Sequence, residues 1–137
     1  MLTSYYAVTP PETPGAICIS RGMPHRTRYR RYWPLAPGKW FKSVSRATYL
    51  SRYRTILDAL DPERVWAELH ELAAGAEPIL LCFESPQGFC YRRLAARWLA
   101  SNLGVTVPEG RLENGRRITV APWEEQAQPL PPELAWF

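Results

Sequence analysis

Short apolar runs mark the expected strands of this chain. They cover residues 2–7, 16–20 and 78–83. Runs of this length are typical of buried strands, and the run at 78–83 follows a helical segment, as a central parallel strand covered on both faces does. Near the C-terminus, Asn114-Gly115 separates two further short segments, which predicts a β-hairpin.

Three longer segments carry apolar residues at helical spacing. In the first, which begins near Ser45, apolar residues follow Tyr49 at i+4, i+7 and i+8. The second begins at Asp61, where an N-cap aspartate, a proline and a glutamate stand in the order that starts a helix. The third ends before Gly104. Strands that alternate with helices predict an α/β fold: a small single-domain layered sheet, mostly parallel, with flanking helices, the C-terminal hairpin and an extended tail.

The length and composition set the expected domain and its surroundings. The 137 residues fit one domain, which we place at 1–122, followed by a proline-rich C-terminal tail at 123–137. No apolar run approaches the roughly 20 residues of a membrane span, and the first residues lack the pattern of a signal peptide. Three cysteines are too few for a disulfide scaffold. We therefore expect a cytoplasmic protein with no membrane partner.

Basic residues are concentrated in one part of the chain. Residues 21–54 hold ten basic residues and no acidic one, whereas the rest holds 7 basic and 13 acidic residues. Aromatic rings are interleaved with them, and this mixture suits a nucleotide or a nucleic acid, because arginines pair with phosphates and rings stack on bases. The candidate phosphate- or nucleic-acid-binding residues are Arg21, Arg26, Arg28, Arg30, Arg31, Lys39, Trp40 and Lys42.

The same segment supports a second interpretation. The arginines would then pair with the acidic remainder of the fold, and the aromatic rings would belong to the core.

Residues 22–44 show neither helical nor alternating periodicity, so we predict a long ordered loop there. Such loops are uncommon and usually functional.

The turn after the apolar run at 78–83 carries the candidate chemistry. Ligands of open α/β sheets gather at the carboxyl ends of the strands, and this turn is expected at such an end. Cys90, near the start of the following helix and beside arginines, is a candidate reactive thiol. Glu84 is a candidate base and Arg92 a candidate anion contact, so these three are the proposed catalytic residues. Tyr5, Ser20 and Cys82 are the proposed pocket residues.

Several specific chemistries fail on spacing. The arginine of a cysteine-phosphatase loop is missing after Cys82, where Gly88 stands at its position. Cys82 and Cys90 are too far apart for a zinc-binding pair, and no second close pair exists. Neither a P-loop nor a dinucleotide fingerprint is present. We therefore expect no metal and no cofactor, and packing remains the alternative role of both cysteines.

The same turn carries a resemblance. The residues concerned are 80–84, 89–92 and 94–99, together with 3–7 and 17–21. They resemble an uncharacterised family, catalogued as domain of unknown function number 488, over about residues 2–107. Cys82, Glu84, Cys90 and Arg92 match its pattern, whereas Tyr91 stands where the family has histidine. The resemblance implies a small cytoplasmic α/β protein of prokaryotes or their phages.

These observations lead to three functional hypotheses. The first is a protein that binds or acts on a phosphate-bearing ligand, a nucleotide or a nucleic acid, through the basic loop and the turn at 82–93. The second is a non-enzymatic module that binds DNA or an acidic protein partner through residues 21–54. The third is thiol chemistry at Cys90.

Overall fold

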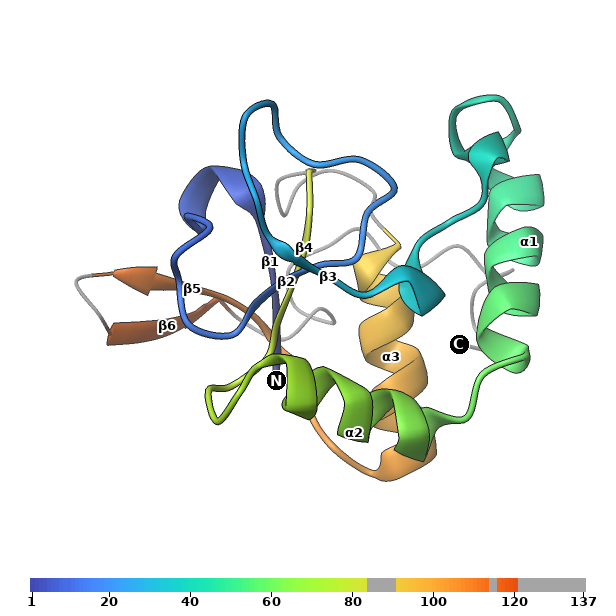
Figure 1. The fold of residues 1–137 in the computed structure, drawn as a ribbon. Coiled ribbons are helices and arrows are strands. Elements are labelled where there is room, and N and C mark those ends of the chain that lie inside the picture. Colours follow the sequence, from blue (N-terminus) through green and yellow to red (C-terminus); the bar gives the residue numbers. More distant parts are fainter. Residues whose placement is uncertain (84–90, 114–115, 121–137) are drawn as a thin grey trace.

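A computed structural model shows one mixed sheet with helices packed on it (Figure 1). It describes residues 1–83, 91–113 and 116–120, and of 111–113 and 117–120 only the backbone. The strands are β1 (Leu2–Tyr5), β2 (Ala16–Cys18), β3 (Arg30–Arg31), β4 (Ile79–Cys82), β5 (Glu109–Glu113) and β6 (Arg116–Val120). Their order in the sheet is β3-β2-β4-β1-β5-β6.

The first five strands are parallel to one another, and β6 returns antiparallel to β5. The central strand β4 pairs with β1 on one side and with β2 on the other. All four of its residues are buried, as the continuous apolar run predicts for a strand covered on both faces. The predicted α/β class, the mostly parallel sheet and the C-terminal hairpin are thus confirmed.

The two faces of the sheet are covered differently. Ile17, Leu80 and Cys82 belong to a large core that also includes residues from all three α-helices. The neighbouring residues of the same strands, such as Cys18 and Leu81, point to the other face and pack with Tyr6 and Tyr29 from the connecting segments. This alternation follows from the two-residue period of a strand.

The helices are α1 (Arg46–Asp58), α2 (Pro62–Leu72) and α3 (Arg92–Leu103). Ser45 caps α1 by accepting a hydrogen bond from Thr48, and Asp61 caps α2 by accepting one from Glu63. Gly104, at a φ of 66°, ends α3 in the left-handed conformation that glycine adopts without strain. The helix starts and stops predicted from these residues are confirmed.

The structure corrects two predictions, one on the end of the first strand and one on residues 22–44. The first strand ends at Tyr5, and Tyr6–Val8 forms a short 3-10 helix, η1, rather than continuing the strand. Residues 22–44 are not a loop without secondary structure. They contain the edge strand β3 and two short 3-10 helices, η2 (Trp33–Leu35) and η3 (Lys39–Lys42). A two-residue strand is too short to leave a periodic pattern in the sequence.

Candidate phosphate-binding edge of the sheet

The carboxyl ends of four parallel strands meet at one edge of the sheet. Because β1, β2, β3 and β4 run in the same direction, the residues that follow them emerge at this edge. Ligands of open α/β sheets bind in this position. Within three residues after the ends of these strands come Tyr6, Ser20, Arg21, Trp33 and Phe83.

Two arginines lie close to the ring of an exposed tryptophan at this edge. The Cζ atom of Arg31 lies 4.1 Å from the ring centroid of Trp33, and that of Arg21 lies 5.8 Å from it. Trp33 is 54% exposed, so much of its indole faces solvent. A guanidinium over an exposed ring contributes only about 0.5–1 kcal/mol, which makes this cluster a weak source of stability.

Backbone carbonyls hold these two arginines in place. Arg31 donates from Nη1 to the carbonyl oxygens of Ser20, at 2.7 Å, and Arg21, at 3.1 Å. Arg21 donates from Nη1 to the carbonyl oxygen of Pro37 at 3.3 Å. Within residues 1–83, 91–113 and 116–120, neither guanidinium forms an ion pair with a carboxylate. Carbonyl oxygens orient a guanidinium without neutralising its charge, so both cations remain available to an anion.

Arg30 takes a different position from its neighbour. Its Nη1 donates to the carbonyl oxygen of Leu72, the last residue of α2, as basic side chains near a helix C-terminus do. Arg30 also lines a cleft of about 380 Å³, together with Gly15, Ala16 and Ala73. Ala16 begins β2, so this cleft lies at the amino edge of the sheet. The structure therefore separates Arg30 from Arg31.

The remaining basic candidates are exposed. Arg26, Arg28, Lys39 and Lys42 have exposed side chains, and Trp40 is half-buried. Within the part of the chain that the structure describes, none of these four cations forms an ion pair. For these four residues, neutralisation by acidic residues of the same fold finds no support among the described contacts. Other parts of the alternative interpretation do find support, because Arg54 of the same segment pairs with Asp58 and the rings of Tyr29, Tyr32, Tyr49 and Tyr53 are buried.

A second exposed ring, Phe83, follows β4 at the same edge. It is 51% exposed and packs edge-on against Tyr6, with 4.9 Å between the ring centroids. The hydroxyls of Tyr6 and Ser20 lie 2.5 Å apart, and Ser20 donates to the carbonyl oxygen of Gly22 at 2.6 Å. Burial raises the pKa of Tyr6, which stays protonated and able to hold this contact. Ser20 is itself buried, so it supports the loop beneath the exposed rings.

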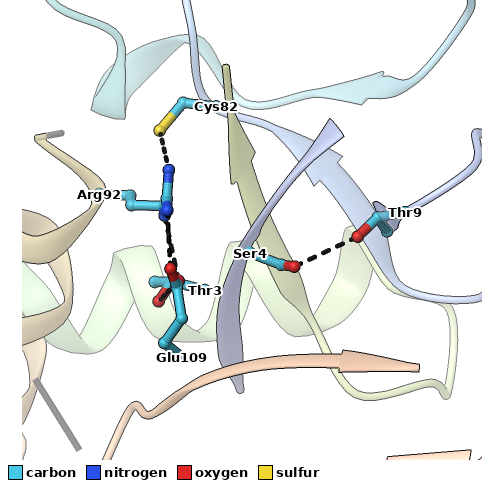
Figure 2. Close-up of polar contacts among 6 residues, drawn as sticks. All are labelled: Thr3, Ser4, Thr9, Cys82, Arg92 and Glu109. Atoms are coloured by element: carbon cyan, nitrogen blue, oxygen red, sulfur yellow. Dashed lines mark hydrogen bonds and ion pairs between the residues drawn. The ribbon is translucent and has the colours of Figure 1, made fainter. Parts of the chain in front are cut away.

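Arg92 lies inside the protein in a polar network (Figure 2). Its Nε and Nη2 donate to the two carboxylate oxygens of Glu109, at 3.1 and 2.7 Å. Its Nη1 donates to the sulfur of Cys82 at 3.1 Å, and Thr3 donates to Glu109 at 2.7 Å. The side chains of Arg92 and Glu109 are 0% and 1% exposed. On the opposite side of β1, Ser4 accepts a hydrogen bond from Thr9.

The predicted catalytic residues are only partly placed. Arg92 begins α3 and contacts Cys82 and Glu109, whereas Arg21 contacts Pro37 and Trp33. Glu84 and Cys90 lie outside the described residues, so their roles remain predictions. Among the predicted pocket residues, Cys82 is buried and Ser20 supports the loop, while the ring of Tyr5 lies 6.0 Å from the Arg92 guanidinium.

Sequence reasoning missed Glu109 and Thr3. Both are polar residues that β1 and β5 place directly opposite each other in register. The one available signal was a glutamate two residues before the first segment of the predicted hairpin, since a charge that becomes buried there needs a partner. Arg93, next to Arg92, is half-buried, and this burial lowers the pKa of its guanidinium, while the charge of Glu109 raises it.

Tyr91 occupies the position of the histidine in the resembling family, and it is a core residue here. It is buried, with its ring centroid 5.5 Å from that of Tyr53 and 6.3 Å from that of Tyr49. Within the described residues, no three His, Cys, Asp or Glu side chains form a group suited to a metal ion. No helix among them has the length and apolar character needed to cross a membrane.

Comparison of the chain with protein-family models, with curated proteins and with solved structures gave no match. The family resemblance therefore stays a prediction.

Proposed function

We propose that the carboxyl edge of the sheet binds a phosphate-bearing ligand, a nucleotide or a nucleic acid. Arg21 and Arg31 would contact the phosphate, and the exposed indole of Trp33 would stack on a base. The observation that carries the proposal is that both guanidinium groups are fixed by carbonyl oxygens beside an exposed ring, with no described carboxylate to neutralise them.

The electrostatics of the chain support the same assignment. The net charge is +4, and the segment 21–54 contributes ten basic residues without an acidic one. Such a distribution raises the local concentration of anions and speeds their association. Arginine, with its planar fork of donors, matches phosphate oxygens better than lysine does.

Binding of a fluorescently labelled oligonucleotide, followed by anisotropy, tests this proposal. We expect Trp33→Ala to weaken binding by about 1–3 kcal/mol, the contribution of one stacked base. Arg64→Ala serves as the control, because Arg64 lies on α2 and pairs with Glu68. Wild-type protein that binds neither the oligonucleotide nor a mononucleotide, or a Trp33→Ala variant that binds as tightly as the control, would contradict the proposal.

A further inference from the structure

A second pairing of a cation with an aromatic ring lies beyond Trp33 along the chain. The Cζ atom of Arg52, on α1, lies 5.7 Å from the ring centroid of Trp40, which belongs to η3. In the same short helix, Nζ of Lys42 lies 5.3 Å from the ring of Phe41. Arg52 and Lys42 are exposed. Positive charge and flat rings therefore coincide at two places, one after β3 and one where η3 meets α1.

The ring of Trp40 is held in a defined position. It contacts Tyr49 edge-on, with 5.2 Å between the centroids. Gly38 makes room for it, since a Cβ atom there would lie only 2.1 Å from the indole nitrogen. Trp40 is half-buried, so part of its surface remains exposed. This arrangement is built by specific packing and does not depend on a freely rotating side chain.

A short stretch of chain joins the two places. In Figure 1 the chain that follows β3 leads up to η3 and the first turn of α1. The hydrogen bond from Arg21 to Pro37 ties the first place to the chain that leads into η3. Trp40 stands seven positions after Trp33, so their Cα atoms are at most about 25 Å apart.

We infer that the ligand is a single-stranded nucleic acid that runs from the Trp33 cluster to the Trp40–Arg52 pair. This inference rests on the proposed function, and it adds the class of ligand and Arg52 as a second contact. A mononucleotide occupies one stacking place, whereas a strand of several nucleotides reaches both. Small domains that bind single strands cover about 4–16 nucleotides, a range that fits two stacking places on one surface.

The aromatic rings favour single strands over duplexes. In a duplex the base faces are covered by their neighbours, so a protein ring has no base to stack on unless the helix is opened. Unpaired bases present both faces, and arginines beside the rings follow the backbone between them. A duplex would instead be read by an element inserted into its major groove.

The test measures affinity as a function of ligand length. The protein is first bound to a labelled 12-nucleotide single strand. The competitors are a mononucleotide, unlabelled single strands of 2, 4, 8 and 12 nucleotides in DNA and RNA form, and a 12-base-pair duplex. We expect affinity to rise by about tenfold or more from the mononucleotide to the longer strands, which gain a second stacked base and further phosphate contacts. The duplex should compete less well than the 12-nucleotide strand.

Two variants separate this inference from the proposed function. Trp33→Ala should weaken the mononucleotide and the 12-nucleotide strand alike, whereas Arg52→Ala should weaken only the strand, by a few-fold. Arg64→Ala, an equivalent change on the exposed face of α2, should affect neither. Equal affinity for all lengths, an Arg52→Ala variant with wild-type affinity for the strand, or tighter binding of the duplex would overturn the inference and leave the proposed function intact. Absence of any nucleotide or nucleic-acid binding would overturn both.

Discussion

Arg92 and Glu109 form a bidentate ion pair that lies wholly inside the protein. The pair joins the first residue of α3 to the first residue of β5, and Thr3 and Cys82 supply further contacts from β1 and β4. Removing two charges from water is costly, and the cost is offset only where geometry and additional hydrogen bonds are favourable. Here four elements of the fold meet around one charged group.

Breaking this pair should destabilise the protein strongly. Glu109→Gln leaves the Arg92 guanidinium buried without a counter-charge, and we expect a loss of about 3–5 kcal/mol in the free energy of unfolding. Urea denaturation followed by circular dichroism measures it. The double variant Arg92→Met/Glu109→Leu should lose less than the sum of the two single changes, because it leaves no charge behind.

The control for this prediction is the exposed pair of Arg54 and Asp58 on α1. Exposed pairs contribute at most about 1 kcal/mol, so Arg54→Ala should change stability little. If Glu109→Gln lowers the free energy of unfolding no more than Arg54→Ala does, the buried pair of Arg92 and Glu109 does not hold the four elements together.

Stability should fall at alkaline pH because of buried tyrosines. Burial raises the pKa of Tyr53 above its ordinary value of 10.0. Burial is also the largest cause of the raised pKa values of Tyr6 and Tyr32. Above pH 10 the unfolded chain releases these protons while the folded chain keeps them. The folded state then binds more protons than the unfolded state. The contribution of these tyrosines to the free energy of unfolding is therefore fully present below pH 10. It decreases as the pH rises further, by up to about 1.4 kcal/mol per pH unit for each tyrosine.

Denaturation at pH 7 to 11 checks this slope. Tyr53→Phe removes one of the titrating phenols together with its hydrogen bond to the carbonyl oxygen of Leu35. It should lower stability at pH 7 by about 1 kcal/mol and flatten the alkaline decrease. An unchanged alkaline slope in this variant would show that Tyr53 titrates in the folded protein as it does in the unfolded chain.

Gly15 and Gly75 should respond differently to alanine. Both have positive φ, 81° and 92°, where a side chain costs about 1–2 kcal/mol. A Cβ at Gly75 meets no atom within 4 Å, whereas one at Gly15 would lie 1.9 Å from the carbonyl oxygen of Glu77. Gly15→Ala should therefore cost clearly more than Gly75→Ala in the same denaturation assay. Equal losses would mean that the contact between Gly15 and Glu77 relaxes freely.

Adjacent arginines of β3 should differ in binding. Arg31 lies over Trp33 at the carboxyl edge, while Arg30 donates to Leu72 at the end of α2. Arg31→Ala should weaken oligonucleotide binding severalfold, and Arg30→Ala should leave it near the wild-type value. Equal losses in both variants, measured by anisotropy at one salt concentration, would show that only the overall charge matters.

The sequence predicts the elements of this fold well where a local rule determines them. Ser45 and Asp61 mark helix starts, Gly104 marks a stop, and the apolar run before Phe83 marks the central strand. Capping and backbone freedom depend on neighbouring residues, and a continuous apolar run is visible in the sequence itself. The pairing of Arg92 with Glu109 could not be predicted in this way. It depends on the register of β1 with β5 and on the packing of α3 against the sheet.

The candidate site was predicted in part. The charge pattern identified Arg21 and Arg31, but it could not separate Arg31 from Arg30, because the two differ only in the direction that alternation along β3 gives their side chains. Trp33 was one of several rings interleaved with the basic residues and was not singled out, and Phe83 was assigned to the buried apolar run. Composition does not tell a core ring from one at a sheet edge. Glu84 and Cys90 remain predictions.

A phosphate-binding site at the carboxyl edge of the sheet requires that oligonucleotide binding depend on salt concentration. Each phosphate contact with a single strand contributes about 0.7 to the slope of log K against log salt concentration. The double variant Arg21→Ala/Arg31→Ala should therefore bind more weakly than wild type and show a slope that is smaller by about 1.4. A double variant with the wild-type affinity and slope would contradict the assignment of a phosphate-binding site to this edge of the sheet.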